Sequence, residues 1–138
     1  MSNALETNPL QDKALVVFTN NTDLPWLRIL KPGYRHCFAV VQKGDYWVTY
    51  EPLCHRTHFD VFSGMETQEI IARFQELGFI VVETRIITPK PKLAPIGPYS
   101  CVEAIKRILG VHKRLIFTPW QLFTYLDNQN KSLFDLIK

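Results

Sequence analysis

A cysteine at the predicted start of a short helix is the feature that most constrains this chain. Residues 97–110 read as a turn, a serine cap, a helix and a glycine stop. Ser100 can accept hydrogen bonds from the free N–H groups of the first turn, and Gly110 can adopt the left-handed conformation that ends a helix. Cys101 is then the first residue inside the helix, where unpaired N–H groups and the positive end of the helix dipole lower the pKa of a thiol. Thiol enzymes keep a nucleophile in this position.

The pattern within this helix predicts which side packs against the rest of the protein. Cys101 shares a face with Ile105 and Ile108. The polar residues fall mostly on the other face, toward water: Glu103, Lys106 and Arg107. A competing interpretation is a buried structural cysteine, because a free cysteine behaves as a small hydrophobic residue. A nucleophile needs a base elsewhere in the chain, so the remaining sequence has to supply one.

Length and composition fit one globular domain. With 138 residues the chain is long enough for a hydrophobic core without disulfides. We expect a disordered or loosely attached segment at 1–12, without the features of a secretory signal, and a single domain at 13–138. The net charge of +3 is too small, and the basic residues too scattered, to predict nucleic-acid binding. We also expect no segment that spans a membrane.

The three cysteines predict free thiols. An odd number without Cys-x-x-Cys spacing argues against a disulfide scaffold and favours a reducing, cytoplasmic location. We therefore expect neither Cys37 nor Cys54 to be bonded to Cys101. The spacing Cys54-x-x-x-His58 suits a metal, but a structural zinc site needs four ligands, and the chain offers no second pair at fixed spacing. We expect neither a metal nor a cofactor, and a polar surface loop at 53–64.

The remaining periodicity predicts an α+β fold: an antiparallel sheet of about four to five strands with helices packed on it. Apolar or alternating segments predict strands near residues 14–19, 36–42, 46–51 and 79–87, with shorter candidates at 26–30 and 115–117. Amphipathic patterns predict a helix at 66–77, capped by Ser63 or Thr67, and another that starts at Pro119 with Thr118 as its cap. The polar run 127–130 is expected to break this last helix, and the proline-rich segment 88–98 to be a stiff connector.

The clearest pair of strands brings a histidine and a carboxylate together. A two-residue turn at Lys43-Gly44 places His36 directly opposite Glu51, and a four-residue loop keeps this register. A three-residue loop would shift the register by one. Directly opposed side chains have Cβ atoms within about 5 Å, close enough for an imidazole and a carboxylate to hydrogen-bond. Thr49 is the fallback partner of the ring, and His55 is the alternative base if the register differs.

Together these residues form a candidate catalytic site. Cys101 is the candidate nucleophile, His36 accepts the thiol proton, Glu51 orients the ring, and the helix N–H groups stabilise a thiolate or an oxyanion. For these groups to meet, we expect His36 to leave the sheet on the face that carries Phe38 and Val40. The Cys101 helix would then pack on that same face.

The order of these parts resembles a known family. Histidine before cysteine is the reverse of papain, and a hairpin followed by a capped cysteine helix resembles the circularly permuted branch of the papain-like thiol hydrolases. This branch is the lecithin retinol acyltransferase-like group of the NlpC-like superfamily. The residues that carry the resemblance lie at 36–41, 47–52 and 100–105, within a match of about residues 34–126. The segment 118–122 also looks like uncharacterised proteins of phages and prophages that share the histidine and cysteine segments.

The resemblance implies a permuted papain-like fold and a cysteine peptidase, amidase or acyltransferase that acts on a peptide, amide or acyl substrate through a covalent thioester. The acyltransferases carry Asn-Cys-Glu-His where this chain has Ser100-Cys101-Val102-Glu103. Their second hairpin strand offers a histidine, where this chain offers Thr49 or Glu51. These departures bear on the substrate and on acyl transfer more than on the Cys–His pair.

Two other functions stay open at this point. A papain-like scaffold can lose its activity, which would leave a catalytically inactive phage accessory or adaptor protein. Nucleic-acid binding through exposed aromatic residues and the lysines Lys90 and Lys92 is the third hypothesis, and the modest net charge disfavours it.

Overall fold

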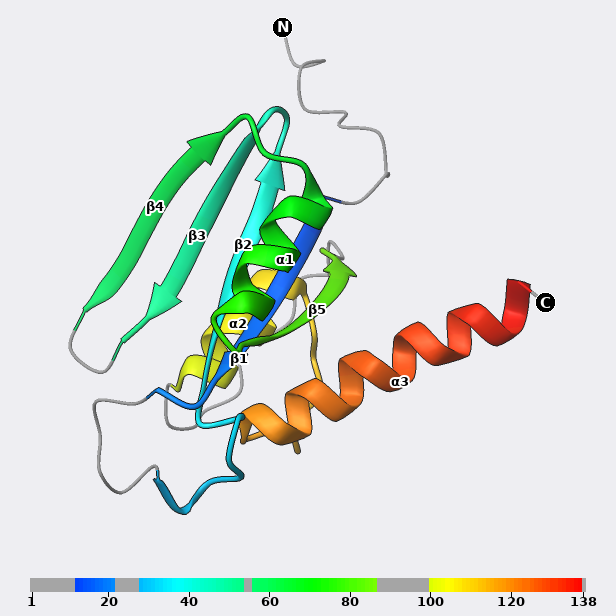
Figure 1. Cartoon of the computed structure of the whole chain (residues 1–138). Coiled ribbons are helices and arrows are strands. Elements are labelled where there is room, and N and C mark those ends of the chain that lie inside the picture. Colours follow the sequence, from blue (N-terminus) through cyan, green and yellow to red (C-terminus); the bar gives the residue numbers. More distant parts are fainter. Residues whose placement is uncertain (1–11, 22–27, 54–55, 87–99, 138) are drawn as a thin grey trace, which may run out of the picture.

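The fold is α+β, as the sequence predicts. The computed structural model describes residues 12–21, 28–53, 56–86 and 100–137. In these residues a five-stranded antiparallel sheet has the strand order β4-β3-β2-β1-β5 (Figure 1). The strands are β1 (Lys13–Thr19), β2 (His36–Lys43), β3 (Tyr46–Pro52), β4 (Thr57–Ser63) and β5 (Ile80–Arg85). The helices are α1 (Thr67–Glu76), α2 (Cys101–Leu109) and α3 (Pro119–Ile137).

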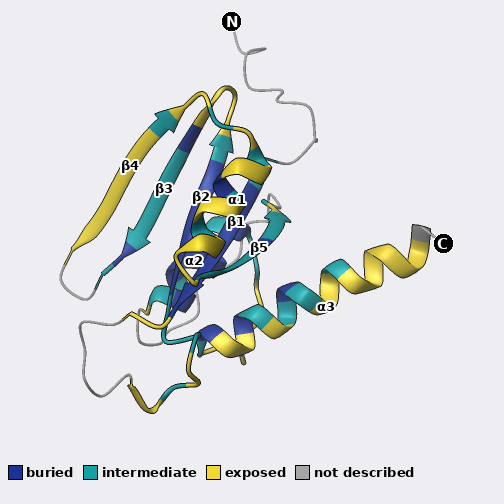
Figure 2. Ribbon diagram, in the orientation of Figure 1, coloured by how far each residue is buried: buried dark blue, intermediate teal, exposed yellow. Residues whose placement is uncertain are grey.

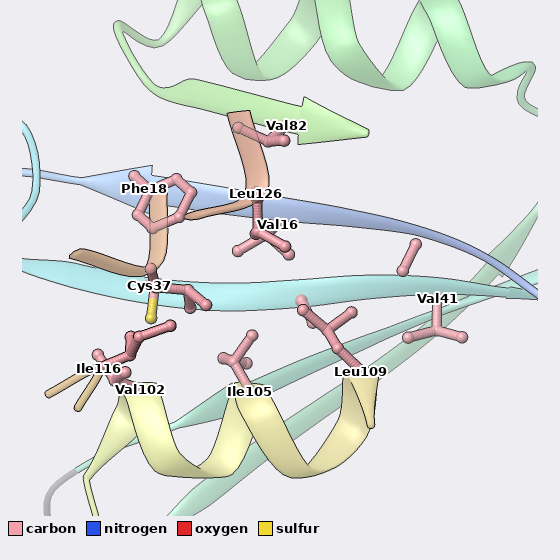
Figure 3. Close-up of a cluster of buried hydrophobic side chains, with 13 residues drawn as sticks. Val16, Phe18, Cys37, Val41, Val82, Val102, Ile105, Leu109, Ile116 and Leu126 are labelled. Atoms are coloured by element: carbon pink, nitrogen blue, oxygen red, sulfur yellow. The ribbon is translucent and has the colours of Figure 1, made fainter. Parts of the chain in front are cut away.

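Strands β1 and β2 form the centre of the sheet, and helices cover both of its faces there. On one face, α2 and α3 pack against alternate residues of the two strands, and Figure 3 shows this cluster from the side. On the other face, α1 packs through Ile70 against Leu15, Val17, Phe38 and Val40. Residues 14–18 of β1 and 37–41 of β2 are continuous apolar runs, because both faces of the sheet are covered there.

The second half of the predicted 53–64 loop is a strand, so that prediction was wrong. Strand β4 pairs with β3 from Pro52–Thr57 to Tyr46–Ser63 and forms an exposed edge of the sheet (Figure 2). Its sequence does alternate, since Thr57, Phe59 and Val61 face one side while His58 and Asp60 face the other. Polar residues at every second position are compatible with an edge strand that has no helix over it.

Helix α3 is continuous, and the predicted break at 127–130 was also wrong. One hydrogen bond and one ion pair, each between residues one helical turn apart, span the polar run: Gln129 Nε2 donates to Tyr125 Oη (2.7 Å), and Lys131 Nζ contacts Asp127 Oδ2 (2.7 Å). Asn130 also donates to the Glu83 carbonyl of β5 (2.9 Å). The last turns extend away from the sheet, where Leu133, Phe134 and Leu136 are exposed (Figures 1 and 2).

Smaller differences concern caps and short strands. Glu66, not Ser63 or Thr67, precedes α1, and its N–H donates to the Glu69 carboxylate (3.3 Å). Thr118 caps α3 as predicted, since its hydroxyl accepts the Gln121 N–H (3.2 Å). Residues 28–30 and 115–117 are not strands. Residues 26–27 and the proline-rich connector at 88–98 lie outside the described residues.

Candidate active site

Helix α2 has the caps that its sequence predicts. The Ser100 hydroxyl accepts the N–H of Glu103 (3.2 Å), the Ser100 carbonyl accepts that of Ala104 (3.0 Å), and Gly110 ends the helix with φ 75°. The helix packs on the sheet mainly through Val102, Ile105 and Leu109 (Figure 3). Cys101 and Ile108 lie at the margin of this contact and are only partly buried. Cys101 is thus held by the core and still reachable from outside.

The helix lies on the face of the sheet opposite to the predicted one. It packs against Cys37, Ala39 and Val41, whereas Phe38 and Val40 face α1. Alternation along β2 fixes which residues share a face, but it does not decide which helix covers that face. Cys37 of β2 therefore lies on the same side of the sheet as Cys101, whereas the predicted packing puts it on the opposite side.

The hairpin register differs from the predicted one by two residues. Lys43 pairs with Tyr46, and the turn is Gly44-Asp45, with Gly44 at φ 60° in its first position. A glycine in that position suits the type II′ turn, whose twist matches that of the strands. Since side chains alternate with a period of two, a shift of two residues leaves every side chain on its face.

Glu51 remains beside His36 in the observed register. Ala39–Tyr50 is the last pair of β2 and β3, so Glu51 lies one residue beyond the pairing and on the diagonal to His36. His36 Nε2 lies 3.3 Å from Glu51 Oε1, and the two side chains are 14% and 29% exposed. Thr49 lies opposite Val40, about 13 Å along the strand from His36. Of the two predicted partners, the structure brings Glu51 to the ring and not Thr49.

The sheet opens where His36 and Glu51 lie. Strands β2 and β3 pair only from Lys43–Tyr46 to Ala39–Tyr50. Beyond that point β2 stays with β1, where His36 pairs with Thr19, and β3 stays with β4 as far as Pro52. A ring at this opening is not confined to one face. This explains how His36 can contact Glu51 and also Cys101 on the α2 side.

Hydrogen bonds from β2 make Cys101 unusually acidic. The hydrogen bond from the Cys37 thiol lowers the pKa of Cys101 most, and burial opposes this effect. The hydrogen bond and the charge of His36, and a hydrogen bond donated by the Cys37 backbone N–H, lower the pKa further. Together they lower the pKa of Cys101 to about 5. The same contact with Cys101, together with burial, raises the pKa of Cys37 well above its ordinary value.

His36 is shifted in the direction that favours its protonated form. Burial lowers the pKa of His36, but the hydrogen bonds and charges of Cys101 and Glu51 outweigh burial and raise it overall. Because Nε2 faces Glu51, Nδ1 is the ring nitrogen available to the Cys101 sulfur. The arrangement favours a thiolate–imidazolium pair with a carboxylate behind the ring.

Lys106 is buried, although the sequence pattern predicts that it faces water. It is 3% exposed, and its ammonium donates to Glu103 Oε2 (3.1 Å) and to the Ile116 carbonyl (3.2 Å). The aliphatic stem lies in the core while the charge is paired at its end. Lys106 thereby ties the chain after Gly110 back onto α2.

Other sequence candidates do not join the site. His58 is exposed on β4, and Cys54 and the alternative base His55 lie outside the described residues. A groove of about 580 Å³ between residues 112–116 and α3 is lined by neither Cys101 nor His36. Within the described ranges, no group of three or more His, Cys, Asp or Glu side chains could hold a metal ion.

Comparison of this chain with protein-family models, curated proteins and solved structures finds no match. Of the helices that the structure describes, none combines the length and the apolar composition needed to cross a membrane.

Proposed function

We propose that this protein is a thiol-dependent hydrolase or acyltransferase that uses Cys101, His36 and Glu51. The observation that carries the proposal is the position of the His36 ring. One nitrogen lies 3.3 Å from the Glu51 carboxylate, and the ring lowers the pKa of Cys101 at the start of a capped helix. Covalent thiol catalysis requires a nucleophile, a base beside it and a group that orients the base, and these three residues supply them.

The chemistry follows from the positions of these groups. The Cys101 thiolate attacks the carbonyl carbon of a peptide, amide or ester, and the N–H groups at the start of α2 stabilise the oxyanion. Ser100 takes the N–H groups of Glu103 and Ala104, which leaves those of Cys101 and Val102. We assign the N–H of Cys101 to the oxyanion, because it belongs to the nucleophile's own residue. Protonated His36 gives its proton to the leaving group, and a thioester remains on Cys101. Neutral His36 then takes a proton from water or from an acceptor, which attacks the thioester and regenerates the thiolate.

The proposal extends to the setting of the reaction. We infer a permuted papain-like arrangement, a cytoplasmic location that keeps the thiols reduced, and a peptide, amide or acyl substrate rather than nucleic acid. The sequence resemblance to the lecithin retinol acyltransferase-like group and to phage proteins supports these inferences. No step in this mechanism calls for a metal or an organic cofactor.

p-Nitrophenyl acetate tests the proposal without knowledge of the natural substrate. Attack by Cys101 releases p-nitrophenolate in a burst and leaves an acetyl thioester. Trypsin places the cysteines on separate peptides, 36–43, 44–56 and 93–106, so the acetyl group can be located by mass spectrometry. We expect hydroxylamine-labile acetylation of peptide 93–106, with none on peptide 44–56.

Two variants complete this test. Cys101→Ser should lose the burst, and His36→Ala should slow it by at least about a hundredfold, since general acid–base groups contribute that much or more. Absence of a burst in the wild-type protein, or equal acetylation of Cys101 and Cys54, would instead favour an inactive adaptor on the same scaffold.

A further inference from the structure

Cys37 is a second thiol in direct contact with Cys101, and the proposed acyl transfer makes no use of its sulfur as a reactant. Its side chain is fully buried, and Cys101 packs against the core cluster to which Cys37 belongs. Figure 3 shows the Cys37 sulfur pointing from β2 toward the first turn of α2, beside Val102. Both thiols are free in this structure.

The two cysteines differ in their access to solvent. Cys101 lies at the margin of the helix–sheet contact and is partly exposed, whereas Cys37 is enclosed by the core. A small oxidant that enters the site therefore meets Cys101 first. An accessible thiolate next to a second thiol is the arrangement found in cysteines that respond reversibly to peroxide.

We propose that a hydroperoxide converts Cys101 and Cys37 into a reversible intrachain disulfide that blocks the site. In the first step the Cys101 thiolate attacks the peroxide O–O bond, which gives a sulfenic acid and, after protonation of the leaving hydroxide, water. In the second step the Cys37 sulfur attacks the sulfenic sulfur. The S–O bond breaks, the hydroxyl leaves with the Cys37 proton as a second water, and the S–S bond forms. The two thiols supply the two electrons that reduce the peroxide.

The change in Cys101 also prepares Cys37 for the second step. The hydrogen bond to the Cys101 thiolate is the main reason that Cys37 holds its proton. A neutral sulfenic acid removes this negative charge, and His36 is close enough to Cys101 to accept the proton that Cys37 releases. Cys101 packs against the core cluster that contains Cys37, so the disulfide forms by an approach of the first helical residue toward β2.

Peptide mapping after treatment with hydrogen peroxide tests the inference directly. A linked pair of the tryptic peptides 36–43 and 93–106, lighter by two hydrogens and restored by dithiothreitol, is the expected product. A Cys101 peptide that gains two or three oxygens while Cys37 remains a free thiol would overturn the inference. A link from Cys101 to peptide 44–56 would do the same.

Two variants of Cys37 distinguish a thiol that reacts with the sulfenic acid of Cys101 from a side chain that only fills the core. Cys37→Ala and Cys37→Ser, each checked for native circular dichroism, should lose the link, and Cys101 should then oxidise irreversibly. Cys54→Ser is the matched control and should still form the link. If Cys101 in both Cys37 variants recovers fully with dithiothreitol as in the wild type, then Cys37 does not have this role.

The consequence of the disulfide, a loss of turnover, rests on the proposed function. The formation of the disulfide does not. A linked peptide in a protein that gives no p-nitrophenolate burst would support the thiol pair and contradict the catalytic proposal. A burst that depends on Cys101 in a protein that forms no link would do the reverse.

Discussion

Cys101 differs from an ordinary thiol because two consecutive residues of β2 face it. The Cys37 thiol, the His36 ring and the Cys37 backbone all stabilise its negative charge, and their combined effect exceeds the cost of burial. The low pKa is thus a property of where α2 begins relative to β2.

Alkylation of Cys101 should consequently follow an unusually acidic titration. We expect the rate of iodoacetamide labelling of peptide 93–106 to rise with a midpoint near pH 5, because the thiolate is the reactive form and the pKa of Cys101 is about 5. Cys37→Ala and His36→Ala should each move the midpoint upward, since each removes a group that lowers this pKa. Mass spectrometry measures the rate, with Cys54 as an internal reference, and a wild-type midpoint near that of a free thiol would contradict the prediction.

Glu51 acts through the ring of His36. Substitution of Glu51 should therefore change the pH dependence of p-nitrophenolate release more than it changes the fold. Glu51→Gln keeps the shape of the side chain and an oxygen that can accept from the ring, but it removes the negative charge that raises the pKa of His36. The pKa of His36 should fall, so the alkaline limb of p-nitrophenolate release should move to lower pH. Thr49→Val is the matched control on the same strand. If both variants shift the limb equally, Glu51 is not the orienting group.

Among the helices and strands, the sequence predicts those features that depend on residues close to one another in the chain. The bounds of α2 follow from Ser100 and Gly110, and the hairpin follows from two strands around Gly44. The choice of turn inside the hairpin was wrong by one position, which shifted the register by two. The His36–Glu51 pairing survived because a two-residue shift preserves faces and brings diagonal neighbours within reach of each other.

Features that depend on tertiary contacts were harder to predict. The sequence of α2 contains an apolar face, yet nothing local decides that this face covers Cys37 rather than Phe38. The burial of Lys106 depends on a carbonyl ten residues later, and the continuity of α3 is supported by a contact between Asn130 and β5. For the same reason the sequence does not place Cys37 in the site: alternation puts it on the other face from Phe38, but only tertiary contacts decide that α2 covers that face.

Lys106 gives a test of how α2 is held. Lys106→Ala removes a buried ammonium that pairs with Glu103 and the Ile116 carbonyl, and we expect a loss of about 2–4 kcal/mol in the free energy of unfolding. Arg107→Ala removes an exposed partner of the same Glu103 and should cost less than about 1 kcal/mol. Urea unfolding measures both values, and similar costs for the two variants would show that burial of Lys106 contributes little.

On the scale of the whole molecule, the candidate site exists only in the folded chain. Its residues come from β2, β3 and the start of α2, and they meet where β2 and β3 part at one end of the sheet. In the unfolded chain the side chains of Cys101 and His36 are no longer close to each other, and both regain ordinary pKa values. The free energy of unfolding must therefore depend on pH through this pair.

The sign of this dependence differs for the two residues. The folded pKa of Cys101 is lowered from 9.0 to about 5, so its stabilising effect is complete above the unfolded pKa and is lost as the pH falls through about 5. The folded pKa of His36 is raised above 6.5, so its effect is complete below 6.5 and is lost as the pH rises through the folded value. Between pH 5 and 7 the contribution of Cys101 to the free energy of unfolding grows by about 2 kcal/mol. The contribution of His36 begins to decline as the pH approaches 7.

We therefore expect the wild-type protein to gain more stability between pH 5 and 7 than Cys101→Ala does. Carboxylates and other groups that titrate in this range contribute equally to both proteins, so the difference between them isolates the thiolate and its effect on His36. Urea unfolding at several pH values, with dithiothreitol present, measures this difference. Cys54→Ser is the control and should follow the wild-type curve. Parallel curves for wild type and Cys101→Ala would mean that Cys101 has an ordinary pKa in the folded protein, which would remove the electrostatic basis of the proposed thiolate–imidazolium pair.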